Sequence, residues 1–493
     1  MKKLLLLLLP LSLLISGFLF LPVLPESQKP ARPNIIVIFM DDLGYGDLSC
    51  YGAAQYTTPN LDRMAGEGVR FTNFLTAQAV CSASRAALLT GCYPNRIGIS
   101  GALFPHAEKG LNPEEVTIAE LLKDQGYATG MFGKWHLGDQ KQFLPLQHGF
   151  DEFMGLPYSN DMWPIGYDGQ PVADSDRRKT TFPALPLLNG NDTLRLLRTL
   201  DDQAQLTGLY TEKAVSFIKR HKKKPFFLYV PHSMPHVPIA ASARFKGKSK
   251  QGTYGDVMME IDWSVGEILK ALKDNGLDNN TLVVFTSDNG PWLNYGNHAG
   301  SAGGFREGKG VSFEGGMRVP CIVRWKGVAP AGTVCNKLSS TIDLLPTIAA
   351  ATNARLPANK IDGVNILPLF KGDSEATPRK YFYYYYRQNN LEAVRRDDWK
   401  LVLPHEGRSY EGQLPGNDGF PGKAPENIPY PLALYDLRRD PSERYDVQEL
   451  YPAIVAELQK VAEEAREDLG DALTQRTGKD VRKSGLSLIN QTK

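Results

Sequence analysis

Short apolar runs that end in polar side chains recur along the chain. Three of them, with the polar residues that follow, are 35–40 before Asp41 and Asp42, 226–230 before His232 and His236, and 282–285 before Asp288 and Asn289. Continuous apolar runs of this length, rich in β-branched and aromatic residues, are typical of strands that are buried on both faces. The pattern therefore predicts three buried strands, each of which ends in a polar turn.

Helix signals lie between these runs. Thr58 and Pro59 have the residue types of a helix N-cap and of the first helical position. Thr117 and Glu120 form a capping-box pattern at the start of a segment that stops at Gly126. Strands that alternate with helices indicate a mainly parallel sheet, and such sheets bind ligands at the carboxyl ends of their strands. We therefore expect an α/β fold in which the polar strand ends meet at one edge.

The first 25 residues have the pattern of an export signal. Lys2 and Lys3 form a positive start, an apolar run covers 4–24, and polar residues follow at 26–29. A run of about twenty apolar residues can also span a bilayer core, so an uncleaved membrane anchor is the alternative. Because the first cysteine, Cys50, lies far beyond this run, we do not expect a lipid-modified N-terminal cysteine. The sequence predicts an exported protein, periplasmic or secreted, that contacts a membrane only if this segment stays uncleaved.

The composition is that of a globular protein, with 42% hydrophobic and 22% charged residues among 493. A chain of this length has room for two or three domains. Its 56 basic and 54 acidic residues give a net charge of +2, and no basic block has interleaved aromatics, so nucleic acid is not an expected partner. Five scattered cysteines do not form a disulfide scaffold. Their odd number leaves one unpaired, for which Cys81 is our candidate, and the sequence leaves open any pairing among Cys50, Cys92, Cys321 and Cys335.

The acidic strand ends favour a metal site. A single Asp-Asp or Asp-Asn pair after a strand is usually a turn, because both residue types cap their own backbone. On neighbouring parallel strands, however, Asp41, Asp42 and Asp288 would bring three negative charges together, and like charges repel unless a cation joins them. The amide oxygen of Asn289 completes an all-oxygen set, which suits calcium or magnesium better than zinc. We expect one calcium ion, because calcium accepts more ligands and a looser geometry.

Two basic motifs have competing explanations. Lys134 and His136 would share one face of an extended segment, although a Lys-Trp-His sequence is also typical of an exposed strand end. Lys309 lies between glycines, which would let its ammonium approach a ligand closely, although an ordinary loop lysine is the alternative. Taken alone, neither motif identifies a site.

Cys81 precedes a helix-like segment. Two serines and Arg85 follow it closely and have the pattern of a helix N-cap. Cys81 would then lie near the positive end of the helix dipole, a position that lowers the pKa of a thiol and attracts anions. The alternatives are a buried structural cysteine and a catalytic thiolate of the protease kind. A thiolate, however, would need a histidine base and would leave the acidic oxygen cage without a purpose.

Separate motifs along the chain match one family in residue type and in order. They are NIIVIFMDDLGYGD (34–47), CSASRAALLTG (81–91), GYATGMFGKWHLG (126–138), SDNGPW (287–292), GKGVSFEGGMRVP (308–320) and LYDLRRDPSERYDV (434–447). Together they resemble the type I sulfatases, in the branch of arylsulfatase A and N-acetylgalactosamine-6-sulfatase. The resemblance implies hydrolysis of sulfate esters and an alkaline-phosphatase-like α/β fold. That fold has a large mixed, mainly parallel sheet flanked by helices, and a smaller C-terminal antiparallel sheet plus helix.

The same resemblance implies a modified residue and a metal ion. Members of the family carry formylglycine, an oxidised cysteine whose aldehyde hydrates to a geminal diol, and Cys81 matches that cysteine. A formylglycine-generating maturation enzyme is then an implied partner. The family signature is C-x-P-S-R, whereas Ala83 stands at the proline position here. The resemblance suggests that some maturation enzymes accept alanine at this position while others prefer proline. The implied calcium ligands are Asp41, Asp42, Asp288, Asn289 and the oxygen of the modified Cys81.

The remaining site residues also receive roles from the resemblance. One hydroxyl of the diol would attack sulfur while Arg85 and Lys134 hold the diol and neutralise charge. Lys309 with His236 would stabilise and protonate the departing alcohol. His136 would help the second hydroxyl to expel sulfate and regenerate the aldehyde.

The chain changes character after about residue 372. Residues 379–404 and 432–441 have the pattern of short strands, and 451–467 that of an amphipathic helix. The expected organisation is a signal segment over 1–25, a catalytic domain over 32–371 and a C-terminal α+β subdomain over 372–493.

Two other functions compete with a sulfatase. A phosphomonoester or phosphonate hydrolase of the same superfamily would share the cationic cradle, but related phosphatases bind two metals, and His232 is the only obvious spare ligand. A binder of sulfated glycans in which Cys81 is never oxidised is the non-enzymatic alternative. We favour a sulfatase that acts on a sulfated carbohydrate and reads it through the irregular loops 157–200 and 405–430.

Overall fold

A ten-stranded sheet lies at the centre of the computed structural model, which describes residues 32–486. Its strands, in spatial order, are β12 (Thr333–Cys335), β2 (Val69–Phe71), β11 (Cys321–Arg324), β10 (Thr281–Ser287), β1 (Asn34–Met40), β9 (Phe226–Pro231), β5 (Ala128–Lys134), β6 (Glu152–Leu156), β7 (Leu185–Asn189) and β8 (Asp192–Leu197). The strands from β10 to β6 pair in parallel, whereas β11 and β7 join them antiparallel. This mixed, mainly parallel sheet confirms the predicted fold class.

The three apolar runs of the sequence are neighbouring strands. β1 lies between β10 and β9, with Ile35 opposite Leu282 on one side and opposite Phe227 on the other. All three strands are buried along their whole length. Because they are parallel, their carboxyl ends and the polar residues that follow lie at the same edge of the sheet.

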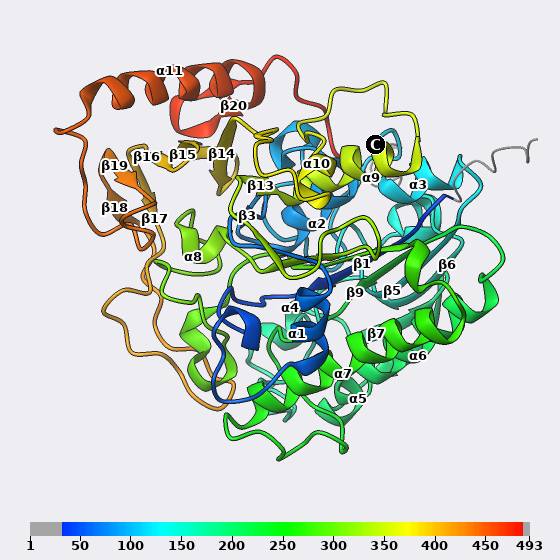
Figure 1. Ribbon diagram of the computed structural model, residues 1–493. Coiled ribbons are helices and arrows are strands. Elements are labelled where there is room, and N and C mark those ends of the chain that lie inside the picture. Colours follow the sequence, from blue (N-terminus) through cyan, green and yellow to red (C-terminus); the bar gives the residue numbers. More distant parts are fainter. Residues whose placement is uncertain (1–31, 487–493) are drawn as a thin grey trace, which may run out of the picture. The chain divides into compact units, whose positions relative to one another are not determined.

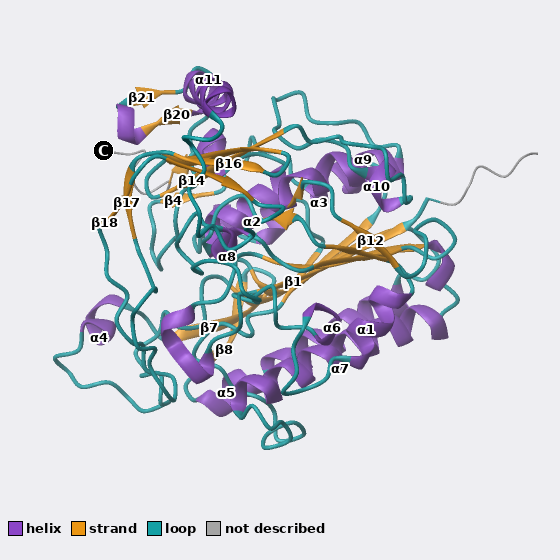
Figure 2. Cartoon of the chain, turned by 60° about the vertical axis from the view of Figure 1, so that its left-hand side comes forward, coloured by secondary structure: helices purple, strands orange, loops and turns teal. Residues whose placement is uncertain are grey.

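Helices cover both faces of the sheet (Figures 1 and 2). On β1, Ile36 and Ile38 pack into one core and Val37 and Phe39 into the other, because successive side chains of a strand point to opposite faces. The helices of the first core are α1 (Pro59–Gly66), α6 (Leu206–Arg220) and α7 (Thr253–Asp274). Those of the second core are α2 (Cys81–Thr90), α3 (Ile118–Lys123), α9 (Leu344–Thr352) and α10 (Leu367–Phe370). The strand ends are therefore supported by an apolar core on each side.

Both predicted helix starts are observed. Thr117 and Glu120 form a complete capping box at α3, in which Thr117 Oγ1 accepts from the Glu120 N–H at 3.2 Å and Glu120 Oε2 accepts from the Thr117 N–H at 2.8 Å. α1 begins with Pro59 at its first position, directly after Thr58. The Thr58 side chain does not cap this helix, because its Oγ1 accepts from the Ser49 N–H at 2.9 Å instead.

A four-stranded antiparallel sheet forms the C-terminal part. Its strands, in spatial order, are β14 (Tyr381–Tyr386), β15 (Asn390–Arg396), β16 (Trp399–Val402) and β19 (Ala433–Asp436). α11 (Pro452–Leu469) packs against this sheet through Leu458, Val461 and Ala465. The sheet and the helix confirm the predicted C-terminal architecture. The chain from Pro33 onward clusters as one compact unit, and the proposed domain boundary near residue 372 stays a prediction.

The predicted signal segment, residues 1–25, lies outside the described residues. Within residues 32–486, no helix is both long enough and apolar enough to cross a membrane. All of the cysteines, including Cys81, are free thiols, so the structure contains no disulfide among them.

Candidate active site at the strand ends

The turn after β1 brings two carboxylates to the edge of the sheet. Asp41 directly follows the strand, and Asp42 adopts a left-handed φ of 61°, which aspartate tolerates better than most residues. The Asp42 N–H donates to Asp288 Oδ1 at 3.1 Å, and the Leu43 N–H donates to Ser287 Oγ at 3.1 Å. These bonds join the end of β1 to the end of β10, so that the carboxyl groups of both strands adjoin.

Cys81 is the first residue of α2, and Val80 occupies the N-cap position without a side-chain cap. The expected serine cap is therefore wrong, because Ser82 and Ser84 lie inside the first helical turn. Their hydroxyls serve tertiary contacts instead. Ser82 Oγ, for example, accepts from the Leu103 N–H at 2.9 Å.

The expected lowering of the thiol pKa is also wrong. Burial raises the pKa of Cys81 to about 12, although the nearby charges of Lys134 and Lys309 act in the opposite direction. The thiol therefore stays protonated, which argues against a thiolate nucleophile and suits a residue that is chemically modified before it acts.

Arg85, in the second turn of α2, is fully buried. Its guanidinium donates to Asp288 Oδ2 at 2.8 Å and to the carbonyl oxygen of Lys134 at 3.1 Å. The same group lies 3.4 Å from Asp41 Oδ1 and 5.5 Å from the ring centroid of Phe39. Arg85 thus connects α2 to the ends of three strands in a single orientation.

β5 ends at Lys134, whose ammonium donates to Asp41 Oδ2 at 2.6 Å and to Ser159 Oγ at 3.0 Å. His136 lies beyond the end of the strand and has a φ of 63°, so Lys134 and His136 do not share a strand face as we expected. His136 Nε2 lies 2.8 Å from the carbonyl oxygen of Leu103. Because a carbonyl only accepts, Nε2 carries the proton. Nδ1 is buried without a hydrogen-bond partner among the described residues, so its lone pair is free to accept a proton.

Lys309 and His236 both contact Asp42. Lys309 Nζ lies 2.7 Å from Asp42 Oδ1 and 2.9 Å from Oδ2. Burial opposes the charge of Lys309, but Asp42 holds the pKa of the ammonium well above its ordinary value. His236 Nε2 lies 3.5 Å from Asp42 Oδ2, and Nδ1 lies 2.5 Å from the carbonyl oxygen of Val237. The neutral His236 ring therefore carries its proton on Nδ1 and presents Nε2 to the acidic turn.

The loop that carries Lys309 is held by the C-terminal part of the chain. The Tyr410 hydroxyl donates to the carbonyl oxygen of Lys309 at 2.6 Å. Glu307, in the same loop, accepts from Ser409 Oγ at 2.6 Å and from the Tyr410 N–H at 2.8 Å. Ser409 and Tyr410 lie in the irregular segment between β17 (His405–Gly407) and β18 (Ile428–Tyr430). This segment therefore supports a candidate catalytic residue directly.

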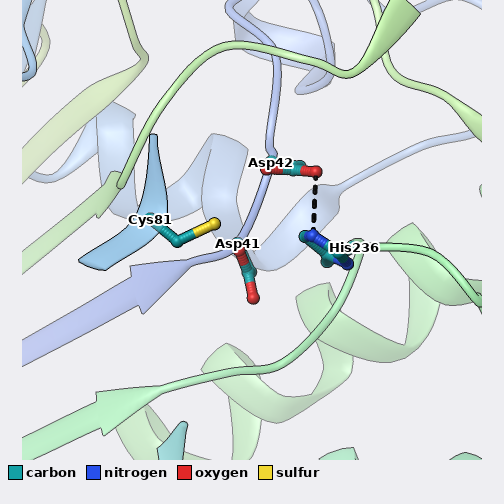
Figure 3. A group of neighbouring side chains, drawn as sticks. All are labelled: Asp41, Asp42, Cys81 and His236. Atoms are coloured by element: carbon teal, nitrogen blue, oxygen red, sulfur yellow. Dashed lines mark ion pairs between the residues drawn. The ribbon is translucent and has the colours of Figure 1, made fainter. Parts of the chain in front are cut away.

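Ligand atoms of Asp41, Asp42, Cys81 and His236 all lie within 4.8 Å of one another, a group that could hold a metal ion (Figure 3). The figure shows the Cys81 sulfur and the His236 ring converging on the turn that carries the two aspartates. Asn289 adjoins this group, because its Nδ2 donates to Asp42 Oδ1 at 2.7 Å. The amide oxygen of Asn289 is buried without a hydrogen-bond partner among the described residues, as expected for an atom that faces a cation.

Asp288 completes the acidic cluster. Burial, and then the charge of Asp41, raises the pKa of Asp288 to about 7. Burial acts on Asp41 in the same direction, but Lys134 holds the pKa of Asp41 well below its ordinary value. A bound cation would relieve the repulsion between these carboxylates. Carboxylate oxygens together with the Asn289 amide oxygen fit a hard ion such as calcium.

All the predicted site residues lie in this one region, although they are not all equivalent there. His236 joins the group of possible metal ligands, whereas Asp288 and Asn289 lie beside it. Three residues that contact the site were not predicted: Ser159, which binds Lys134; Trp292, whose ring lies against the ammonium of Lys309; and Tyr410, which binds the backbone of Lys309. Ser159 lies in a loop with no recognisable motif. Trp292 belongs to the SDNGPW motif but has no charge that would single it out.

Comparison with known proteins gives matches over almost the whole described chain. A family model described as Sulfatase matches residues 33–354, and a model of the C-terminal region of aryl-sulfatase matches residues 377–485. The chain is 41% identical to arylsulfatase A of Bos taurus over 437 residues, which cover 84% of this chain and 83% of that protein. It is 39% identical to N-acetylgalactosamine-6-sulfatase of Canis lupus familiaris over 469 residues, which cover 89% and 86%. Among solved structures it resembles the PsFucS1 sulfatase from Pseudoalteromonas sp., with a TM-score of 0.79, 29% identity and coverage of 88% and 89%.

Proposed function

Because the chain belongs to the sulfatase family and is a hydrolase of sulfate esters, we propose that it works with a formylglycine made from Cys81 and one calcium ion. The observation that carries this proposal is the place of Cys81. Its sulfur lies within 4.8 Å of ligand atoms of Asp41 and Asp42, and burial keeps the thiol protonated. A protonated thiol is a poor nucleophile, so we infer that Cys81 takes part in the reaction only after its conversion to formylglycine.

The nucleophile side of the reaction involves Cys81, Arg85, Lys134 and His136. A formylglycine at position 81 would supply, as its hydrate, two hydroxyl groups on one carbon: a nucleophile for sulfur, and a second hydroxyl whose deprotonation would let sulfate leave and the aldehyde return. Arg85 and Lys134 are buried beside it and offset the negative charge. His136 accepts the proton of the second hydroxyl on Nδ1, the nitrogen that has no other partner among the described residues.

The leaving-group side involves Lys309 and His236. Their side chains meet at Asp42 and not at Asp41 and Asp288, where Lys134 and Arg85 bind. Lys309 offsets the charge that develops on the departing oxygen. His236 must first take up a proton from solvent on Nε2, since the neutral ring carries its proton on Nδ1, and the imidazolium then donates that proton to the departing oxygen. A poor leaving group such as a sugar alcohol depends on this help more than an activated phenol does.

Asp41, Asp42, Asp288, Asn289 and the oxygen of the modified Cys81 would hold the calcium ion. When bound, calcium supplies Lewis-acid polarisation of the sulfate group. Two observations favour an ion here: the amide oxygen of Asn289 has no hydrogen-bond partner among the described residues, and the carboxylates of Asp41 and Asp288 repel each other.

We propose a sulfated carbohydrate as the substrate. One similar protein is by name an N-acetylgalactosamine-6-sulfatase, and the irregular stretches 157–176 and 408–427 offer chain with which to read a sugar. The rest of the predicted loop 157–200 is largely regular, because it contains β7 and β8 of the central sheet. The signal-like residues 1–25 favour export to the periplasm or beyond, with membrane contact only if that segment is retained. Conversion of Cys81 to formylglycine would also require a maturation enzyme that accepts Ala83.

Intact-mass analysis of the peptide that contains Cys81 tests the proposal. We expect the mass of formylglycine in active protein, and unmodified cysteine in fully active protein would refute the mechanism. In a parallel kinetic assay, matched phosphate esters should react far more slowly than sulfate esters. Sulfated-glycan binding without turnover by protein that contains formylglycine would instead favour a binding function.

A second test uses the Cys81→Ser variant. A serine hydroxyl can accept sulfate but has no second hydroxyl with which to expel it, so we expect at most one equivalent of alcohol released per chain. Cys92→Ser is the matched control, because Cys92 is also a free, buried cysteine but is absent from the metal-ligand group, and it should keep full turnover. Many turnovers by the Cys81→Ser variant at the parent rate would contradict the diol mechanism.

A further inference from the structure

One indole ring contacts both residues of the proposed leaving-group side. Lys309 Nζ lies 4.3 Å from the ring centroid of Trp292. The ring of His236 lies 5.5 Å from the same indole, centroid to centroid, with the planes tilted by 58°. An ammonium over an indole face is attracted by the electrons of the ring. Lys309 is therefore held from two directions, by the carboxylate of Asp42 and by the ring of Trp292.

Trp292 is itself fixed by its neighbours. The half-buried indole packs edge-on against Tyr295, with ring centroids 4.8 Å apart, and Tyr295 packs in turn against Tyr167 at 5.1 Å. The residue before the indole, Pro291, accepts a hydrogen bond from the Lys309 N–H at 2.9 Å. The backbone and the side chain of Lys309 are thus both attached to the same short segment.

We propose that Trp292 is a positioning residue that holds Lys309 and His236 together for departure of the alcohol. The inference rests on the proposed function of these two residues. Without the ring, the ammonium of Lys309 would be held by Asp42 alone and His236 would lose a packing partner. The nucleophile side should be affected less, since Arg85 and Lys134 are held by Asp288 and Asp41.

Two aryl sulfates that differ in leaving-group basicity test this role. Phenyl sulfate needs help with leaving-group departure, whereas 4-nitrophenyl sulfate leaves largely unaided. We expect Trp292→Leu to lower kcat for phenyl sulfate by about 3- to 30-fold, the range of a cation–π contact, with a much smaller loss on 4-nitrophenyl sulfate. Trp292→Phe, which keeps an aromatic face, should recover most of the loss. All proteins are compared at equal formylglycine content.

Trp263→Leu is the matched control. Trp263 on α7 is also half-buried and also carries a cation over its ring, since Arg244 lies 4.7 Å from the centroid. The control variant should leave the ratio of the two rates unchanged. Equal losses on both substrates in Trp292→Leu, or no loss on either, would overturn the inference.

Two further variants separate this inference from the proposed function. If Lys309→Ala and His236→Ala lower both rates equally, the leaving-group assignment itself is wrong. If they discriminate between the substrates and Trp292→Leu does not, only the role of Trp292 is wrong. Should the leucine variant not fold, Trp292→Met, made both in the parent and in a Lys309→Ala background, decides. We expect no additional loss on phenyl sulfate there, because the ring has no ammonium left to hold, and a full additive loss would refute the coupling.

Discussion

Calcium should raise the thermal stability of the protein, and the rise should depend on Asp288. The acidic cluster exists only in the folded chain, because Asp42 and Asp288 are separated by 246 residues in the sequence. An ion that binds this cluster therefore stabilises the folded state over the unfolded state. Burial and the charge of Asp41 raise the pKa of Asp288 to about 7. A bound cation would offset this repulsion and favour the ionised form of Asp288, so Asp288 should contribute to the binding of the ion.

The size of the effect follows from binding linkage. At a calcium concentration 100-fold above Kd, the folded state gains about 2.7 kcal/mol. Unfolding entropy is about 2 cal/mol/K per residue, or roughly 1 kcal/mol/K for a chain of this size, so the midpoint should rise by about 3 °C. A tenfold loss of affinity in Asp288→Asn would remove about 1.4 kcal/mol of this gain, roughly half of the shift.

Scanning calorimetry in a chelator and then in added calcium measures this shift without any need for activity. Asp47→Asn is the control, because Asp47 is also a buried carboxylate near the acidic turn, but its oxygens accept hydrogen bonds from Gly44, Tyr254 and Ser301. It should show the same calcium-induced rise as the parent. A parent without any rise would refute the metal site. A full rise in Asp288→Asn would show that the ion is held without Asp288.

Three other changes have expected outcomes. Burial raises the pKa of Asp47 to about 7, so the folded state keeps a proton that the unfolded state loses; the free energy of unfolding should therefore fall as pH rises from about 4 to about 7. Urea denaturation at a series of pH values measures this fall. Asp47→Asn should make the free energy of unfolding less dependent on pH in this range, and an equally steep fall in the variant would contradict the assignment. Tyr410→Phe removes the hydroxyl that donates to Lys309 and should lower the free energy of unfolding by about 1 kcal/mol, with a larger kinetic loss on phenyl sulfate than on 4-nitrophenyl sulfate. An unchanged rate ratio would show that this backbone contact does not position Lys309. Ala83→Pro restores the family signature but removes an N–H that donates to Gly101 at 3.2 Å. Its stability should fall by up to about 1 kcal/mol, while mass analysis should show more formylglycine in a host whose maturation enzyme prefers proline; an unchanged fraction would show that Ala83 does not limit conversion.

The central strands could be predicted from the sequence because they are buried on both faces and leave continuous apolar runs. The outer strands leave no such signal. β8 is largely exposed and β12 has three residues, so neither leaves the continuous apolar run of a buried strand. Capping at Thr117 was predictable because both partners lie within one turn, whereas the real partner of Thr58 is Ser49, outside the helix.

The candidate site shows the same limit. Residues that end strands carry their own signal, but Ser159, Trp292 and Tyr410 contact the site only because distant loops fold together. The pKa of Cys81 was predicted with the wrong sign because two effects compete. A helix terminus contributes about 0.3–1 kcal/mol, whereas full burial can shift a pKa by several units, and burial cannot be read from the sequence around one cysteine.

The charges of the site favour a single cation and a sulfate ester. Three basic side chains bind the three carboxylates: Arg85 contacts Asp288, Lys134 contacts Asp41 and Lys309 contacts Asp42. The formal charges of these three pairs cancel, so a buried anion is bound well only if another positive charge is added. One divalent cation would supply two positive charges, enough for the singly charged sulfate ester and for the doubly charged sulfate that is released. A phosphate monoester carries about one more negative charge than a sulfate monoester at neutral pH. Within residues 32–486 a single group of His, Cys and acidic ligand atoms could hold an ion, and His232 contacts Ser264 on α7 at 3.2 Å instead of joining it. The single candidate cation site among the described residues therefore suits the lower charge of a sulfate ester better.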